Sequence, residues 1–410
     1  MRILLINHYA GSPQHGMEYR PYYLSREWVR AGHSVHVVAA SYSHVRFKQP
    51  PANAGALNES IDGICYCWLP TPAYSGNGFG RLRNVGSFVS QLWRNAADWA
   101  NKFRPDMVIA SSTYPMDFWV ARRIARRCGA KLVYEVHDLW PASLIEVAGM
   151  SAYHPFALLC QKAENDAYRD ADVVVSMLPK VAEHMEAHGL DLRRLHIVPN
   201  GIALDDWHDE SVELDSELAT LLNQFRTGGK AIVGYAGSHG IPNALDTLLD
   251  AAALLRDQPI VFVLVGDGHE KQSLADRVLA EGLSNVFMFA PIAKSQIPCF
   301  LRMLDIAYIG WKHSSIYRFG ISPNKLMDYM MAGCAVLHSV DAGNNPVAEA
   351  GCGLTVAPES ADAVAQGIAA LVECSTEERA AMGARGREFV ISRHSYRNLA
   401  KQFLDSVEFA

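Results

Sequence analysis

The sequence predicts an α/β protein built from two doubly wound domains, and three observations support this prediction. First, short apolar runs that favour β-strands alternate with amphipathic segments of helical periodicity along the chain. Second, several strand candidates are apolar at every position, which is typical of strands buried on both faces of a parallel sheet. Third, 410 residues exceed what one ordinary core accommodates, and the strand–loop–helix pattern restarts near residue 231.

The first half of the chain contains a regular series of strand and helix candidates. The predicted strands are 3–7, 35–40, 64–69, 107–111, 131–136, 172–177 and 195–199, and the predicted helices are 19–31, 86–102, 116–128 and 155–171. This alternation predicts a parallel sheet with helical crossovers.

The second half repeats the pattern. Its predicted strands are 231–236, 261–268, 285–290, 305–310, 335–340 and 354–358, with helices at 244–255 and 396–409. We therefore expect domains at 1–200 and 201–395, with the polar, acidic stretch 203–230 as their connection. The last helix, within 396–410, is expected to pack back on the first domain. Ligands should bind at the carboxyl ends of the strands.

The composition is that of a soluble globular protein, with half of the residues apolar and a fifth charged. No apolar run approaches the roughly 18–20 residues that a membrane-spanning helix needs. The opening MRILLINHYAG is expected to be a first strand, because it lacks the long apolar region of a secretory signal. The eight cysteines form no CxxC pair, which favours reduced, packing cysteines in a cytoplasmic protein.

Charge is distributed unevenly between the halves. Residues 1–200 contain 21 Lys and Arg against 17 Asp and Glu, and the remainder contains 16 against 26. Residues 81–103 place aromatic and aliphatic side chains on one helical face beside Arg81, Arg83 and Arg94. Packing against a sheet explains most of that face. An aromatic and basic helix on a net-positive half also favours peripheral contact with an anionic membrane surface.

The most informative segment is FGISPNKLMDYMMAG, residues 319–333. Ser322 can cap a helix that ends at Gly333, and a helix N-terminus favours a phosphate. Lys325 opposes the helix dipole unless an anion lies between them, so we predict that it binds a diphosphate. Asp328, one turn further, is predicted to accept hydrogen bonds from ribose hydroxyls. The alternative is an ordinary capped helix with a solvated lysine.

This segment resembles the signature of family 4 retaining glycosyltransferases, in which two glutamates eight positions apart precede the turn that ends the helix. The second acidic position falls on Asp328 and the first on Gly320. The S-P-N-K-L form is similar to that of a subgroup acting in O-antigen, capsule and colanic-acid synthesis. Three further passages resemble family motifs in the family's order: IVPNGIALDDW (197–207), YAGSHGIPNALDTLLDAA (235–252) and LVGDGHEKQSL (264–274).

The resemblance implies a GT-B fold, in which two Rossmann-like domains face each other across a cleft, and a retaining hexosyltransferase activity. The implied donor is a UDP-sugar, with an N-acetylated or deoxy hexose, and the implied acceptor is a polyprenyl-diphosphate-linked saccharide. We expect no metal or other cofactor, and a cytoplasmic location at the inner face of the membrane.

The resemblance also assigns site residues. The expected catalytic residues are His137, which lies in EVHDLWP (135–141), and Lys325. The expected acceptor ligands are Glu18, Arg20 and Asp138. The expected donor ligands are Gly16, Gly237, Ser238, Gly240, Ser322, Asn324, Lys325 and Asp328.

The chain departs from the family pattern at three charged positions. Ser238 and Asn243 occupy positions where the family usually has Arg and Lys, and Gly320 removes a carboxylate. We expect Lys325 and the helix N-termini after Gly240 and Ser322 to compensate. The missing charges also favour an alternative, a catalytically inactive sugar-nucleotide-binding or scaffold protein.

Two other hypotheses receive less support from the residues. A nucleotide-sugar-modifying enzyme on Rossmann domains would carry G-x-G-x-x-G after strand one, and this motif is absent there. Asp170-Ala171-Asp172 resembles the D-x-D of metal-dependent transferases, but it lies at a helix–strand junction where an acidic turn is expected. We therefore predict no metal site.

Overall fold

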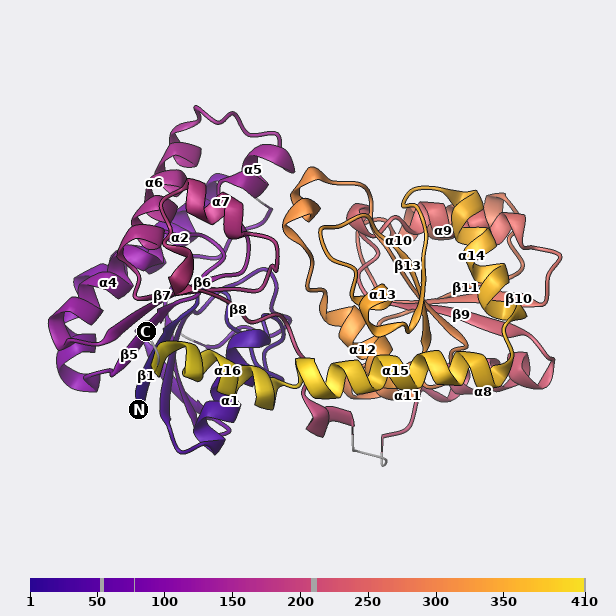
Figure 1. Cartoon of the computed structure of the whole chain (residues 1–410), viewed down its shortest axis with the longest axis horizontal. Coiled ribbons are helices and arrows are strands. Elements are labelled where there is room, and N and C mark those ends of the chain that lie inside the picture. The colour runs from indigo at the N-terminus through magenta and orange to yellow at the C-terminus, as the bar shows by residue number, and fades with distance from the viewer. Residues whose placement is uncertain (52–54, 77, 208–211, 409–410) are drawn as a thin grey trace. The chain divides into compact units, whose positions relative to one another are not determined.

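The computed structural model describes residues 1–51, 55–76, 78–207 and 212–408, which fold as two compact units. The first unit comprises residues 1–200, 319–322 and 396–410, and the second comprises 201–318 and 323–395. In each unit, helices cover both faces of a largely parallel sheet (Figure 1). This is the Rossmann-like architecture that the sequence predicts. Segment 319–322, expected in the second domain, packs with the first unit instead.

The sheet of the first unit has eight strands in the order β3-β4-β2-β1-β5-β6-β7-β8. They are β1 (Arg2–Ile6), β2 (Ser34–Ala40), β3 (Leu57–Ile61), β4 (Ile64–Leu69), β5 (Met107–Ala110), β6 (Lys131–Val136), β7 (Val173–Ser176) and β8 (Leu195–Ile197). Every neighbouring pair is parallel except β3–β4. The order of connection reverses between β1 and β5, and such a switch point is where open α/β sheets bind ligands.

The helices of the first unit bring its C-terminal segment onto its N-terminal one. They are α1 (Arg20–Arg30), α2 (Phe79–Arg94), α3 (Ala96–Asp98), the π-helical η1 (Trp99–Phe103), α4 (Asp117–Cys128), α5 (Ala142–Glu146), α6 (Pro155–Asp170), α7 (Ala182–Ala187), the 3₁₀ turn η2 (Leu192–Arg194) and α16 (Tyr396–Glu408). The indole of Trp28 in α1 donates to the carbonyl of Ala400 in α16 at 3.0 Å and packs edge-on against Phe403. Helix α16 is therefore part of the first unit's packing.

The sheet of the second unit has six parallel strands in the order β11-β10-β9-β12-β13-β14. They are β9 (Ala231–Ala236), β10 (Ile260–Val265), β11 (Val286–Phe289), β12 (Ile306–Gly310), β13 (Ala335–Ser339) and β14 (Gly353–Thr355). Here the switch point lies between β9 and β12, so the loop after β9 lies where a ligand is expected.

Two separate cores, one on each face of this sheet, hold the second unit together. The helices are α8 (Ser216–Thr227), α9 (Leu245–Leu254), α10 (Lys271–Ala280), α11 (Ile297–Leu301), α12 (Asn324–Ala332), α13 (Pro346–Ala350), α14 (Ala361–Glu373) and α15 (Thr376–His394), with 3₁₀ turns η3 (Leu204–Trp207), η4 (Ile241–Asn243), η5 (Lys294–Gln296) and η6 (Ser315–Phe319). Side chains of α8, α11, α12 and α15 fill one core, and those of α9 and α14 fill the other.

The predicted strands and helices are present, but the prediction omitted several helices, including α14 and α15, and three other segments differ from it. Strand β3 was missed, because Leu57–Ile61 is polar at its centre and forms the antiparallel edge. The helix predicted at 86–102 begins earlier, at Phe79, and breaks at Asn95. The expected connection 203–230 contains α8, whose Leu218, Leu222 and Phe225 recur at helical spacing and enter the core.

Two predictions from composition can be compared with the structure. None of the helices in the described ranges has the length and apolar character needed to cross a bilayer. All eight cysteines lie within those ranges and are free thiols.

Candidate functional site

The helix of the signature segment, α12, begins later than the sequence predicts. Its N-cap is Pro323, and no side chain caps it. Ser322, the predicted cap, instead accepts a hydrogen bond from the backbone N–H of Asn200 at 2.7 Å, and its own carbonyl accepts one from the Asn200 side chain at 2.8 Å. The capping prediction is therefore wrong, because the Ser322 hydroxyl is held by Asn200. Gly333 ends the helix in the left-handed conformation, as predicted.

Lys325 reaches from the first turn of α12 to the carboxyl end of β9. Its Nζ donates to Tyr235 Oη at 2.8 Å and to Asn243 Oδ1 at 2.6 Å, and lies 4.6 Å from the centroid of the Tyr235 ring. Both hydrogen-bond partners are neutral. Burial lowers the pKa of Lys325 to about 7, because the ammonium loses water without gaining a carboxylate. An anion bound here would restore the charge.

The loop after β9 is tied to the same lysine. Tyr235 Oη donates to the carbonyl of Ser238 at 2.7 Å, and Asn243 Nδ2 donates to that carbonyl at 3.0 Å. Asn243 thus uses its amide to join the loop to Lys325. At the position where the family usually carries a lysine, this chain carries the residue that positions Lys325.

Glycines let the loops after β9 and β10 pack backbone against backbone. A Cβ on Gly266 would lie 1.8 Å from the carbonyl oxygen of Gly237, and one on Gly268 would lie 2.4 Å from that of His239. Gly237 itself has a φ of 148°, which side chains rarely adopt. Gly240 is buried, whereas Ser238 is exposed. The predicted donor residues Gly237, Ser238 and Gly240 therefore form one compact loop beside Lys325.

His239 is a further candidate that the sequence analysis did not single out. It is fully buried, and both of its ring nitrogens lack a hydrogen-bond partner in the structure. Burial lowers its pKa to about 4, and the charges of Lys271 and Lys325 add to this effect. A neutral imidazole with unused nitrogens beside Lys325 suits a ligand group. Its position in the G-S-H-G loop was the available signal in the sequence.

The two remaining donor candidates on α12 differ in exposure. Asn324 is exposed at the first helical position, and Asp328 is half-buried one turn later. Burial raises the pKa of Asp328 to about 7, and the charge of Lys294 opposes this effect. Either protonation state of this carboxyl group leaves an oxygen that accepts from a hydroxyl.

In the first unit, the carboxyl ends of β5 and β6 carry a buried polar cluster. Ser111 Oγ donates to Glu135 Oε2 at 2.6 Å, and His137 Nε2 lies 2.9 Å from that hydroxyl and 3.2 Å from Glu135 Oε2. Because the hydroxyl proton is directed at Glu135, His137 Nε2 carries a proton and donates. His137 is thus held in one ring orientation by a buried carboxylate.

Glu135 is ionised in this cluster although it is fully buried. Burial alone would raise its pKa, but the charges of Arg20 and His137 and hydrogen bonds from His137 and Ser111 hold it well below the usual value. Asp117, at the start of α4, accepts a hydrogen bond from the backbone N–H of Ser112 at 3.1 Å. Burial raises its pKa to about 7, and its Oδ1 has no hydrogen bond.

Two family models match this chain over most of its length. A glycosyl transferase 4-like domain matches residues 15–201, and a glycosyl transferases group 1 domain matches residues 223–389. The chain belongs to these glycosyltransferases.

A relative and two solved structures extend this result. The putative colanic acid biosynthesis glycosyl transferase WcaI of Escherichia coli K12 is 24% identical over 403 residues, covering 93% of each chain. The sucrose-phosphate synthase of Thermosynechococcus elongatus matches with a TM-score of 0.74 and 17% identity, over 99% of this chain and 98% of that one. Anabaena HepE in complex with UDP-glucose matches with a TM-score of 0.66 and 16% identity over all of both chains.

These comparisons decide between the hypotheses drawn from the sequence. The GT-B class of fold and the resemblance to glycosyltransferases are confirmed. A nucleotide-sugar-modifying enzyme is no longer a candidate. Donor, acceptor and stereochemical outcome stay predictions.

Arg20 of this glycosyltransferase has a different place from the one predicted. Its side chain is 1% exposed, its Nε donates to Glu135 Oε1 at 2.9 Å, and its two terminal nitrogens donate to the carbonyls of Pro199 and Val198. Because these three hydrogen bonds occupy the buried guanidinium, Arg20 is not available to bind an acceptor. We reassign Arg20 to holding Glu135, and through it His137.

The other acceptor candidates and Gly16 lie in loops of the first unit. Asp138 accepts from the backbone of Leu139 at 2.9 Å, from the Trp140 indole at 3.2 Å and from Ser143, so it organises its own loop. Glu18 is half-buried. Gly16 has a φ of 107°, and its carbonyl accepts from the Ser12 N–H at 3.1 Å in the loop after β1.

Asp170 and Asp172 serve the structure, as the sequence analysis expected of an acidic turn. Asp170 pairs with Arg122 and Arg169, and Asp172 accepts from the backbone N–H of Leu132 at 2.7 Å. Their carboxylates are therefore already used in joining α6 and β7 to their neighbours.

Proposed function

We propose that this glycosyltransferase moves an N-acetylated or deoxy hexose from a UDP-sugar to a lipid-diphosphate-linked saccharide in surface polysaccharide synthesis, with retention of configuration. The reaction takes place at the cytoplasmic face of a membrane, and it uses no metal cofactor. HepE has been solved with UDP-glucose, which supports a UDP donor for this fold. WcaI is named for colanic acid biosynthesis, which supports the class of product.

The observation that carries the proposal is the half-buried Lys325 beside the glycine loop after β9. Its Nζ has two neutral partners and a pKa of about 7 in the absence of a ligand. A diphosphate supplies the missing countercharge, while N–H groups of the α12 N-terminus bind its oxygens. Lys325 then carries the role that the family divides among several cations.

Such an arrangement catalyses transfer by stabilising the leaving group. As the bond to the sugar breaks, negative charge develops on the diphosphate, and Lys325 and the nearby N–H groups are already placed to meet it. The diphosphate in turn takes the proton of the acceptor hydroxyl. His137, held through Nε2, has its other nitrogen left for the sugar or the acceptor.

An apolar surface of the first unit supports an acceptor at a membrane. The side chains of α2, α5 and α6 share a small core, and large apolar residues of these segments remain exposed outside it. They are Phe79 (81% exposed), Leu82, Trp93, Val147, Tyr153 (88% exposed), Leu158 and Leu159. Amphipathic helices with exposed aromatic residues and flanking arginines bind anionic bilayers.

The test of the donor site compares Lys325→Ala with Lys230→Ala, an exposed lysine of the same unit. A thermal-shift screen of nucleotide sugars first identifies the donor for the unaltered protein. We expect Lys325→Ala to raise the donor Michaelis constant roughly 10- to 100-fold, because a charged hydrogen bond contributes about 1.5–3 kcal/mol. Lys230→Ala should leave it unchanged.

Two outcomes would contradict the proposal. An unchanged Michaelis constant and turnover in Lys325→Ala would remove Lys325 from the donor site. Donor binding without hydrolysis or transfer, in the presence of a crude lipid-linked acceptor, would favour the inactive binding or scaffold protein. If the protein failed to sediment with vesicles rich in anionic lipid at low salt, the proposed contact with a membrane would be wrong.

A further inference from the structure

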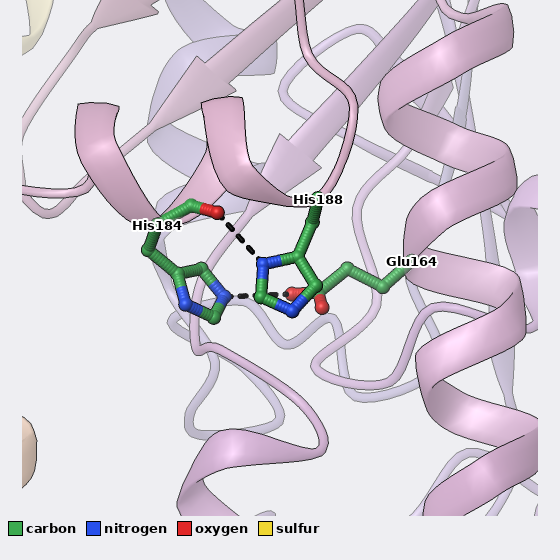
Figure 2. A group of neighbouring side chains, drawn as sticks. All are labelled: Glu164, His184 and His188. Atoms are coloured by element: carbon green, nitrogen blue, oxygen red, sulfur yellow. Dashed lines mark hydrogen bonds and ion pairs between the residues drawn. The ribbon is translucent and has the colours of Figure 1, made fainter.

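Three side chains of the first unit form a cluster that plays no part in the proposed sugar transfer. Glu164 lies on α6, His184 lies on α7, and His188 follows α7 directly. One ligand atom from each residue lies within 4.8 Å of the others, and Figure 2 shows the two imidazoles and the carboxylate turned toward one another. Two imidazoles and a carboxylate are a ligand set that zinc accepts.

The spacing is close to that of a bound metal ion. In a tetrahedral zinc site, with metal–ligand distances near 2.0–2.1 Å, ligand atoms lie about 3.4 Å apart. His184 Nε2 lies 3.7 Å from Glu164 Oε1. The widest separation in the group exceeds the tetrahedral value by roughly 1.4 Å at most, which rotation of side chains can close.

Neighbouring groups orient the side chains of Glu164 and His188. Tyr168 Oη donates to Glu164 Oε1 at 2.8 Å, and Gln161 Nε2 donates to Glu164 Oε2 at 2.9 Å. His188 Nδ1 lies 2.7 Å from the carbonyl of His184, so it carries the proton and leaves Nε2 with a lone pair (Figure 2). Metal sites in proteins fix their ligands in this way.

The cluster also contains an unsatisfied polar atom. His184 Nε2 is buried and makes no hydrogen bond, while Glu164 is 1% exposed. A buried nitrogen without a partner costs free energy unless something binds it. A protonated His184 facing Glu164 would be an ion pair at a longer distance than a hydrogen bond, and a metal ion between them satisfies both.

We propose that Glu164, His184 and His188 bind a divalent transition-metal ion of the zinc class. Imidazole ligands favour Zn²⁺ over the hard cations Mg²⁺ and Ca²⁺, which take oxygen ligands. Three protein ligands leave a fourth position for water. The ion joins α6 to α7, and the ring of His184 packs edge-on against Phe319 at 5.1 Å. Because the ion joins two helices and plays no part in the proposed sugar transfer, we assign it a structural role in supporting the segment that leads into α12.

The experiment titrates the full-length protein, stripped with chelator, with Zn²⁺ and separately with Co²⁺. We expect about one equivalent of Zn²⁺ to bind, and a melting temperature raised by about 5–10 °C at a hundredfold excess over the dissociation constant. Co²⁺ should give the intense visible bands of a tetrahedral nitrogen–oxygen site. The Co²⁺ spectrum is measured on the unaltered protein, and it tests metal binding independently of sugar transfer.

Variants then assign the ligands. His188→Ala and Glu164→Gln should weaken Zn²⁺ binding at least about 100-fold and abolish the Co²⁺ bands. His313→Ala, which removes an exposed histidine of the second unit, should change neither. Absence of Zn²⁺ binding in the unaltered protein, or retained stoichiometry and bands in folded His188→Ala, would overturn the proposal. The cluster would then be a histidine–glutamate ion pair.

Discussion

In each sheet, candidate site residues lie at the carboxyl edge, where the parallel strands end, but the two edges are built differently. In the first unit, side chains from β5, β6 and α1 form a closed network around the buried Glu135. In the second unit, two glycine loops meet backbone to backbone, and the cation Lys325 lies beside them without an anionic partner. At the first edge the buried charges of Glu135 and Arg20 are paired, whereas at the second edge Lys325 has no anionic partner.

This difference suggests that the first edge serves mainly stability and the second edge serves mainly donor binding. In the first unit, a completed ion pair holds His137, the proposed catalytic histidine, in place and contributes to the fold. In the second unit, the charge of Lys325 and the N–H groups at the α12 N-terminus lower the stability of the protein when no ligand is bound. A bound diphosphate would raise that stability again. Changes at the first edge should therefore act on stability, and changes at the second edge should act on the donor.

The largest effect is expected from Glu135→Ala. It leaves the buried Arg20 guanidinium without its carboxylate, and breaking a buried pair costs about 3–5 kcal/mol. Denaturant unfolding measures the loss. Asp98→Ala, which breaks an exposed pair with Lys102, is the control and should cost less than about 1 kcal/mol. Equal losses in the two variants would show that the first edge is not a stabilising network.

A smaller effect is expected from Gly266→Ala in the second unit. The new Cβ meets the carbonyl of Gly237, so the two loops must separate, at a cost of about 1–3 kcal/mol. Because these loops flank Lys325, donor affinity should fall along with thermal stability. Gly86→Ala has open space around its Cβ and should lose neither. If Gly266→Ala bound the donor normally, contact between the loops would not matter for the site.

The smallest effect is a pH dependence of donor binding. Below pH 7, Lys325 is an ammonium in both the free and the bound protein, so affinity should be flat. Above pH 7, the free protein carries a neutral Lys325 and donor binding must take up a proton. Affinity should then fall by up to about tenfold per pH unit until the pKa of the complex is reached.

Calorimetry with a UDP-sugar measures this dependence, since its diphosphate does not titrate in that range. Proton uptake follows from repeating the titration in buffers of different ionisation enthalpy. Lys325→Arg is the control, because its guanidinium stays charged and should give a flat profile. Constant affinity for the unaltered protein between about pH 6 and 9 would mean that Lys325 does not change charge at the donor site.

The fold was predictable because its signals are local. Buried parallel strands are apolar at every position, and these runs located the sheet strands other than β3, whose polar centre belongs to an exposed edge. The site was predictable only in part. Lys325 stands out in its own segment, but its partners Asn243 and Tyr235 lie 82 and 90 residues away in the chain.

Arg20 shows why side-chain roles resist prediction. It is an arginine after a glycine loop, which suggests a ligand, but its carboxylate partner lies 115 residues later. The three proposed metal ligands could not be predicted from the sequence for the same reason. His184 and His188 are four residues apart, whereas Glu164 comes from another helix, so no spacing in the sequence joins the three.

The boundary between the two units has a consequence for recombination. Since segments 319–322 and 396–410 belong to the first unit, the chain passes from one unit to the other at 200–201, 318–319, 322–323 and 395–396. A chimera made with a single crossover would therefore join incomplete halves. Exchange of donor specificity between relatives calls for a transplant that keeps Phe319–Ser322 and α16 from the same parent as residues 1–200, so that each unit inherits all of its own packing.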